Sequence, residues 1–362
     1  MRVKITLAVF ALGMLLSAYR MSSEARTDGS SIRGRVYWQN LTGEPPATGL
    51  QVQLLKDEED AVAESRTNNV RKSQALYEAV KKGNIAAVQT LISQGVDVNS
   101  KSSQGAFPLY TAALNGNAPI VRLLLSKGAD ANVGKGDYTP LFGAAQEGYL
   151  EIATMLIASG ADVNARSDDN GMTPLLMAAS SQKNAVGKLL LEKGAAVDST
   201  TTTDAKTPIM MACGFAIRFR HDPRLGMVLE PDFTTDDPSL VQALLAKGAD
   251  IQARDKANLT PLNHCVSSVM AAKTKALLAK GADVNEKYPN GNTPLFEVFD
   301  SALGNIPEPP GFVATLQVLL DAGANVKDRN SKGETALMII AKSTHSRANE
   351  VKTLLKKYGA TE

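Results

Sequence analysis

Two short motifs recur through most of this chain of 362 residues, and their spacing restricts its fold more than any other feature. One is Thr-Pro followed by an aliphatic residue, which begins at Thr139, Thr173, Thr207, Thr260 and Thr293. The other is a Gly that ends a Leu-rich stretch and opens a short tail, such as Gly-Ala-Asp-Val-Asn at residues 160–164. Copies of each motif recur about every 33 residues, and a fixed period of this length is the signature of a repeat array.

The two motifs predict where helices begin and end. Thr is a favoured N-cap because its hydroxyl can accept a hydrogen bond from an unpaired backbone N–H, and Pro at the next position already has a helical φ. Leu141 and Ala145 then follow at helical spacing, while Ile152 and Leu156 form the apolar stripe of a second helix. The Gly supplies the left-handed residue that ends this second helix. One unit is therefore two helices and an extended finger, with an apolar face that only a neighbouring unit can cover.

The composition also favours packed helices. Hydrophobic residues make up 44% of the chain but aromatic residues only 5%, so the core must consist mainly of Leu, Ala, Val, Ile and Met. Such a core is more typical of helices than of sheets. The 39 Lys and Arg nearly balance the 37 Asp and Glu, which argues against nucleic acid or an anionic membrane as a partner.

The repeated residues resemble the ankyrin repeat, whose pattern runs Thr-Pro-Leu-His-x-Ala-Ala and ends in Gly-Ala-Asp-Val-Asn. The resemblance covers residues 73–362 and implies a mainly α ankyrin-repeat solenoid of about eight helix-turn-helix units with β-finger loops. The units are expected near residues 73–105, 106–138, 139–172, 173–206, 207–259, 260–292, 293–334 and 335–362. The His of the family pattern is replaced by Phe142, Leu176, Met210, Asn263 and Phe296. The hydrogen bond that this His usually makes is therefore expected to be absent.

Two units are longer than the period. Thr207 and Thr260 are 53 residues apart, and Thr293 and Thr335 are 42 apart. The helical pattern stops over residues 214–238 in the first case, and the prolines of residues 305–311 exclude a helix in the second. Both insertions fall between the first and second helix of their unit, so they are expected on the same edge of the solenoid.

The resemblance implies a protein partner, bound through the finger tips and the exposed edges of the first helices. Carried over by position, this surface comprises Tyr138, Gln146, Glu147, Met172, Ser180, Ser181, Lys206, Leu259, Asn292 and Asp300. Arg218, Arg220 and Arg224 add cationic side chains from the larger insertion. Two questions remain open. The apolar residues that precede Thr-Pro either form a contact patch for the partner or pack against the adjacent finger. The larger insertion is either a recognition loop or a tolerated surface loop.

The amino terminus has the pattern of a secretory signal. Arg2 and Lys4 precede an apolar run over residues 5–18, and Ser23-Glu24-Ala25 supplies small residues for cleavage. The run is shorter than the roughly 20 residues of a membrane span. We therefore expect a signal peptide over residues 1–25, no stable membrane span after cleavage, and a protein that is periplasmic or secreted. An uncleaved anchor is the alternative.

Residues 26–72 do not follow the repeat. Residues 35–39 and 50–54 alternate as strands do, on either side of a turn at residues 42–46. Residues 31–67 resemble the start of the carboxypeptidase-regulatory-like β domain in truncated form. A short β segment and a linker are therefore expected before the repeats.

The chain lacks the residue patterns of catalysis or metal binding. His221, His264 and His345 lie in different units without metal-ligand spacing, and no phosphate-binding Gly loop or nucleophile elbow occurs. No metal, no cofactor and no enzymatic activity are therefore expected. Cys213 and Cys265 fall on first helices of adjacent units. Because stacked helices lie about 8–10 Å apart and a disulfide needs Cα atoms within about 7 Å, two buried thiols are favoured over a disulfide.

The function expected from the sequence is a non-catalytic protein–protein interaction scaffold in an exported compartment. The alternative is a secreted effector that engages host-cell proteins through the same array. The identity of the partner is not encoded in the repeat frame, because arrays of one fold differ in their surface residues.

Overall fold

The computed structural model describes residues 19–28, 31–40, 67–134, 136, 139–214, 216–222, 226–232, 235–303, 309–343 and 346–361. The chain divides into two compact units, Met1–Arg71 and Lys72–Glu362.

In the first unit, the strands β1 (Tyr19–Asp28) and β2 (Ser31–Asn40) pair antiparallel, from Tyr19 opposite Asn40 to Asp28 opposite Ser31. The strand predicted at residues 35–39 lies within β2. Its partner is β1, whereas the other predicted strand, at residues 50–54, lies outside the described residues. Since β1 includes Ala25, cleavage after this residue would leave only Arg26–Asp28 paired with β2.

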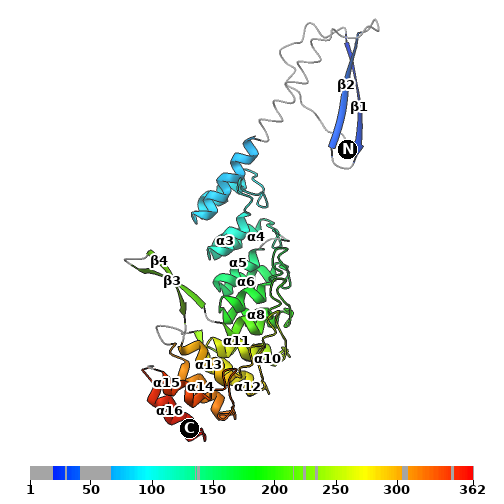
Figure 1. Cartoon of the computed structure of the whole chain (residues 1–362). Helices are drawn as coiled ribbons and strands as arrows, with labels where there is room; N and C mark the ends of the chain where they lie inside the picture. Colours follow the sequence, from blue (N-terminus) through cyan, green and yellow to red (C-terminus); the bar gives the residue numbers. More distant parts are fainter. Residues whose placement is uncertain are drawn as a thin grey trace. The chain divides into compact units, whose positions relative to one another are not determined.

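The second unit is a stack of short helix pairs (Figure 1). Its helices are one over residues 67–81, α2 (Ile85–Ser93), α3 (Pro108–Leu114), α4 (Ala118–Ser126), α5 (Pro140–Glu147), α6 (Leu150–Ala158), α7 (Pro174–Ser180), α8 (Asn184–Glu192), α9 (Pro208–Cys213), α10 (Ser239–Ala246), α11 (Pro261–Ser267), α12 (Ala271–Leu278), α13 (Pro294–Leu303), α14 (Phe312–Asp321), α15 (Ala336–Lys342) and α16 (Ala348–Lys357). From α3 onward, the odd-numbered first helices pack on one another, and so do the even-numbered second helices. The predicted mainly α solenoid is confirmed.

The first helices approach closely because their facing residues are small. Ala112, Ala144 and Ala178 are fully buried, and a methyl group on Gly143 would lie only 3.3 Å from the backbone of Leu114 on the preceding first helix. The residues that replace the family's His join this core where they are apolar, since Phe142, Leu176, Met210 and Phe296 are all buried. Burial of each such side chain contributes about 1.5–3 kcal/mol.

The predicted Thr caps form at only some of the units. The hydroxyl of Thr173 accepts a hydrogen bond from the N–H of Leu176 at 3.2 Å, and that of Thr335 accepts one from Met338 at 3.3 Å. The buried hydroxyls of Thr139 and Thr207 have no partner, so the prediction is wrong for them. Their helices still begin at the next residue, where Pro fixes a helical φ without help from the cap.

Consecutive fingers are joined by an asparagine side chain. Asn132 donates from Nδ2 to the carbonyl of Gly160 at 2.9 Å, and its Oδ1 accepts from the N–H of Asp162 at 2.8 Å. The same pair of hydrogen bonds forms at Asn99, Asn164 and Asn285. We call each pair an asparagine bridge. Asp198 stands at this position before the fifth unit and can only accept, from the N–H of Asp250 at 3.1 Å.

The larger insertion contains a β hairpin that the sequence analysis did not predict. The strands β3 (Ala216–Asp222) and β4 (Gly226–Asp232) pair antiparallel between α9 and α10 and project from the stack (Figure 1). The alternation of Ile217, Arg218 and Phe219 was the available signal. The second insertion lies between α13 and α14, and its residues 304–308 lie outside the described ones. Both insertions therefore occur at the turn between the two helices of a unit, as the spacing predicts.

The expectation of two free thiols is wrong. Cys213 and Cys265 form a disulfide that joins α9 to α11, and their Cα atoms lie 4.5 Å apart. The expectation treated the distance between helix axes as a distance between Cα atoms. Each Cα lies about 2.3 Å from its own axis, so two Cα atoms that face each other lie about 4–5 Å closer than the axes. Both residues are fully buried, as expected.

Candidate functional site

The candidate site is the face formed by the finger tips and the first helices. Each finger ends in a turn that leads through Thr-Pro into the next first helix. In most fingers one polar residue closes this turn with its side-chain oxygen, as Asp255 does by accepting from the N–H groups of Ala257 and Leu259, both at 2.9 Å. The corresponding residues elsewhere are Ser102, Ser167, Thr201 and Asn330. The turns therefore hold the residue before each Thr in a defined place.

The predicted residues of the third and fourth units divide into exposed and buried ones. Gln146 and Glu147 are exposed at the end of α5, where Nε2 of Gln146 donates to Oε1 of Glu147 at 2.9 Å. Ser180 is exposed and Ser181 half-buried at the end of α7. Met172 is only 8% exposed. It packs in a cluster with Phe142, Ala165 and Leu176, which supports the packing alternative for this residue. Tyr138 lies outside the described residues.

Further along the face, the predicted residues carry hydrogen bonds and ion pairs. Nζ of Lys206 lies 3.0 Å from a carboxylate oxygen of Asp204, and Leu259 is half-buried. Asn292 is buried, and its Nδ2 donates to Oδ2 of Asp300 at 2.8 Å. Asn292 is therefore bonded within the array, whereas Lys206 and Leu259 remain partly exposed.

One histidine on this face is held by a carboxylate. Nε2 of His264 lies 2.9 Å from Oδ2 of Asp255. Burial lowers the pKa of His264 below its usual value, and the hydrogen bond and charge of Asp255 only partly oppose this shift. The hydrogen bond joins His264 on α11 to the finger turn that Asp255 closes.

The predicted arginines lie on a different edge. Arg218 and Arg220 belong to β3, opposite Glu230 and Val228 of β4, and Arg224 lies outside the described residues. The hairpin leaves the array at the turn between two helices of a unit, whereas the fingers leave from the other ends of the same helices. The predicted residues of the fingers thus lie on one edge of the array, whereas Gln146, Glu147, Ser180 and Ser181 lie at the other ends of the first helices, on the same edge as the hairpin.

A buried lysine that the sequence analysis missed lies at the base of the hairpin. Lys273 is 1% exposed, and its Nζ donates to Oε1 of Gln182 at 2.8 Å and to the carbonyl of Gly214 at 3.3 Å. Burial lowers the pKa of Lys273 to about 8, against the opposing charges of Asp236 and Asp237. Helix α12 also contains the exposed Lys275, and no local pattern distinguishes Lys273 from it.

Asp236 completes the base of the hairpin. Its carboxylate accepts from the N–H of Ala272 at 2.8 Å and of Lys273 at 3.2 Å, at the start of α12. Oδ2 of Asp237 accepts from Nδ2 of Asn184 at 2.7 Å. Together with the disulfide, these bonds fix the ends of the insertion to the units on either side of it.

The finger of the sixth unit has a buried hydroxyl without a partner. Tyr288 is 5% exposed and occupies the finger position at which Asp255 or Asn330 closes the turn in other units. Its Oη has no hydrogen-bond partner. Burial raises the pKa of Tyr288, and the charges of Glu297 and Glu286 raise it further. An unsatisfied buried polar group costs about 1–3 kcal/mol, and Tyr288 is the only tyrosine among the described residues in this condition, beside the hydroxyls of Thr139, Thr207, Thr274 and Thr315.

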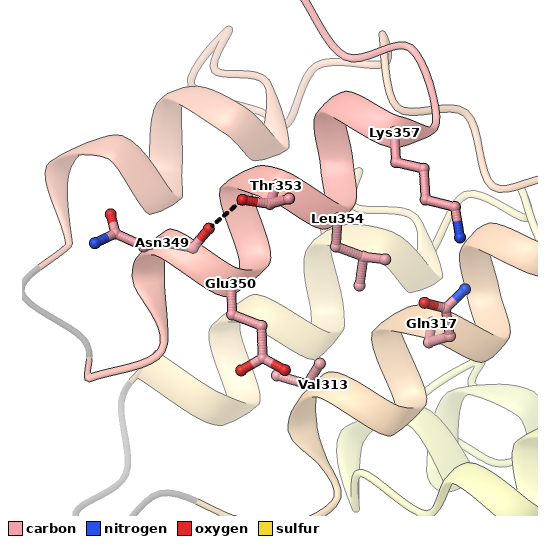
Figure 2. A pocket seen from close by; sticks show the side chains of 7 residues that line it. All are labelled: Val313, Gln317, Asn349, Glu350, Thr353, Leu354 and Lys357. Carbon is pink, nitrogen blue, oxygen red and sulfur yellow. Dashed lines mark hydrogen bonds between the residues drawn. The ribbon is translucent and has the colours of Figure 1, made fainter.

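The outer face of the array, formed by the second helices, has a shallow groove between α14 and α16 (Figure 2). Its volume is about 460 Å³, and it is lined by Val313, Gln317, Asn349, Glu350, Thr353, Leu354 and Lys357. Glu350 already pairs with Arg347 at 2.7 Å. The groove contains none of the residues predicted for partner binding.

Two searches of the described residues give negative results. No group of three or more His, Cys, Asp or Glu side chains there could hold a metal ion. No described helix is both long and apolar enough to cross a membrane.

Comparisons with known proteins agree with the repeat architecture. A family model of three ankyrin repeats matches residues 76–167, and a model of a single ankyrin repeat matches residues 170–202. A search of curated protein sequences finds no match. Ankyrin repeats are protein–protein interaction modules. The chain therefore contains ankyrin repeats within residues 76–202, and helix pairs of the same kind continue to residue 357.

Proposed function

We propose that this array is a non-catalytic scaffold that binds a partner protein in an exported compartment, through its finger tips, first-helix edges and larger insertion. The observation that carries the proposal is the division of each unit into packing residues and free ones. In α5, for example, Leu141 and Ala145 are fully buried, whereas Gln146 and Glu147 are exposed. The exposed residues therefore make no contribution to the core and are available to a partner.

The frame that carries these residues is rigid. The asparagine bridges join successive fingers, and the disulfide and Lys273 join the units beside the insertion. A surface that is ordered before binding loses little conformational entropy on association, which favours affinity. This supports recognition by a preformed face.

The disulfide supports an exported location. Disulfides persist in oxidising compartments and are rare where cellular thiols keep cysteines reduced. The predicted signal peptide points in the same direction. A secreted effector that acts inside a host cell remains the alternative, and the disulfide is less suited to it.

Affinity capture with variants tests the binding face. Tagged full-length protein is incubated with envelope extract of the producing cells, and the proteins that it retains are quantified. Glu147→Arg combined with Ser180→Arg places two large cations at exposed positions of the first helices and is expected to reduce retention of the specific partner at least tenfold. Glu192→Arg, exposed on the second helix α8, is the matched control and should retain the partner as the unchanged protein does. Equal retention by all three would reject the first-helix edge as the binding surface.

Cell fractionation tests the location. A mature protein that begins at Arg26 and is recovered from the periplasm or medium is the expected result. A chain that begins at Met1 and remains with the cytosol would contradict export.

A further inference from the structure

Two carboxylates on the seventh unit lack a cation, whereas several other carboxylates of the same face have one. Glu297 is half-buried and Asp300 exposed, and they lie one turn apart on α13. Residues three apart on a helix are neighbours. The charge of Asp300 and, more strongly, burial raise the pKa of Glu297, so the two carboxylates are close enough to repel.

The comparison with neighbouring units makes this pair unusual. Among the described residues, Asp204 pairs with Lys206 at 3.0 Å, Glu286 with Arg254 at 2.6 Å and Glu334 with Lys342 at 2.8 Å. Asp255 has His264. Glu297 and Asp300 accept only from the neutral amides of Asn290 and Asn292. Their negative charge is therefore uncompensated within the part of the chain that the structure describes.

The unpartnered hydroxyl of Tyr288 is an independent observation at the same place. Its Oη is buried and near the carboxylates of Glu286 and Glu297, whose charges act on it. The finger turn does not need this side chain, because Oδ1 of Asn290 accepts from the N–H of Asn292 at 3.0 Å instead. Buried polar groups without a partner are rare in folded proteins, and a bound group is one explanation for them.

We propose that Glu297, Asp300 and Tyr288 form a receptor for a lysine or arginine side chain of the partner protein. This inference deepens the proposed function and rests on it. Two carboxylates suit a cation that can donate several hydrogen bonds, and the phenolic oxygen can accept one more. The carboxylates meet the cation first, since Tyr288 lies beneath the surface. A cation at this place would also remove the repulsion between the two acidic groups.

A short cationic peptide serves as the probe. The peptide is tri-arginine with acetylated and amidated ends, and tri-citrulline is its neutral isostere. Each peptide is titrated into the full-length protein, and the chemical shifts of the backbone amides are measured by NMR. Tri-arginine is expected to shift amides of residues 286–300, and tri-citrulline to leave them unchanged. Shifts spread evenly over acidic residues of the whole array would overturn the proposal, whether or not any variant folds.

Variants test the individual groups. Glu297→Gln with Asp300→Asn keeps the size of both side chains and is expected to raise the Kd for tri-arginine at least tenfold without change in the melting temperature. Tyr288→Phe is expected to raise the Kd several-fold while the protein becomes no less stable, a combination that a purely structural role would not produce. Glu151→Gln with Glu192→Gln, both exposed on second helices, removes two charges elsewhere and should leave the Kd within twofold. Equal losses in this control and in the Glu297 and Asp300 variant would show a general charge effect and reject the receptor.

Partner capture separates this inference from the proposed function. If the Glu297 and Asp300 variant still captures the partner as well as the unchanged chain does, the receptor is rejected and the scaffold function stands. If the unchanged chain binds tri-arginine at residues 286–300 but captures no protein partner, the scaffold function fails instead.

Discussion

Nζ of Lys273 donates a hydrogen bond to Oε1 of Gln182 at 2.8 Å, and thereby joins the sixth unit of the array to the fourth. Gln182 in turn donates from Nε2 to the carbonyls of Met211 and Ala212 in the fifth unit, both at 3.3 Å. This contact crosses the one unit that is interrupted by a long insertion. It lies beside a junction where Asp198 provides only half of an asparagine bridge. The buried lysine therefore strengthens the array where its regular connection is weakest.

Replacement of Lys273 by Ala is expected to destabilise the protein by about 2–4 kcal/mol, because it leaves a cavity and removes the donor for Gln182 and Gly214. Urea unfolding followed by circular dichroism measures the loss. Lys275→Ala, at an exposed position of the same helix, is the control and should change stability by no more than about 0.5 kcal/mol. Similar losses in the two variants would show that the buried contacts of Lys273 have little energetic value.

The pKa of Lys273 also predicts how stability changes with pH. In the folded protein this pKa is lowered from 10.5 to about 8. Between these values the unfolded chain binds a proton at this site and the folded chain does not, so stability contributed by Lys273 rises as pH increases from about 8 to 10.5. The slope is at most about 1.4 kcal/mol per pH unit.

Comparison with the Lys273→Met variant separates the pH-dependent contribution of Lys273 from that of the other titrating groups, which both proteins share. The difference in unfolding free energy between the two proteins should change with pH above about 8 in favour of the chain with Lys273. If the two stability curves run parallel from pH 7.5 to 10, Lys273 has an ordinary pKa.

Reduction of the disulfide is expected to destabilise the array. Cys213 and Cys265 are 52 residues apart. In the chain-entropy treatment, closure of a loop of this length contributes about 4 kcal/mol. Urea unfolding with and without reductant measures the difference, and Cys213→Ser with Cys265→Ser serves as a reductant-insensitive control. Free thiols detected in the denatured, unreduced protein would contradict the bond itself.

An asparagine at position 198 is expected to stabilise the protein. Asp198 accepts from Asp250 but cannot donate, whereas Asn164 donates from Nδ2 to the carbonyl of Gly194 in the next unit. Asp198→Asn should add the corresponding bond to Gly248 and raise the unfolding free energy by about 0.5–1.5 kcal/mol. Asn164→Asp is the reverse change, with a loss of similar size. If both substitutions stabilise the protein, or if neither changes its stability, the Nδ2 donor makes no contribution to the free energy of unfolding.

The candidate binding face was only partly predictable. Exposure at Gln146 and Glu147 follows from their place at the end of a first helix. Met172 occupies a similar sequence context to Leu259, yet it is buried among Phe142 and Leu176 because each of these large residues replaces the family's His in its own unit. The division of the predicted residues between two edges was also missed, since it depends on which end of a helix each segment leaves.

The sequence by itself determined the repeat, the ends of the helices and the places of both insertions. These features are local: Pro fixes φ at the first position of a helix, and Gly128 or Gly160 adopts the positive φ that ends one. Only the tertiary structure decided that Cys213 meets Cys265, that Lys273 reaches Gln182, and that Tyr288 lies beside Glu297 without a partner. Each of these depends on how closely two units approach, and that distance is set by the small residues packed between first helices rather than by any motif within one unit.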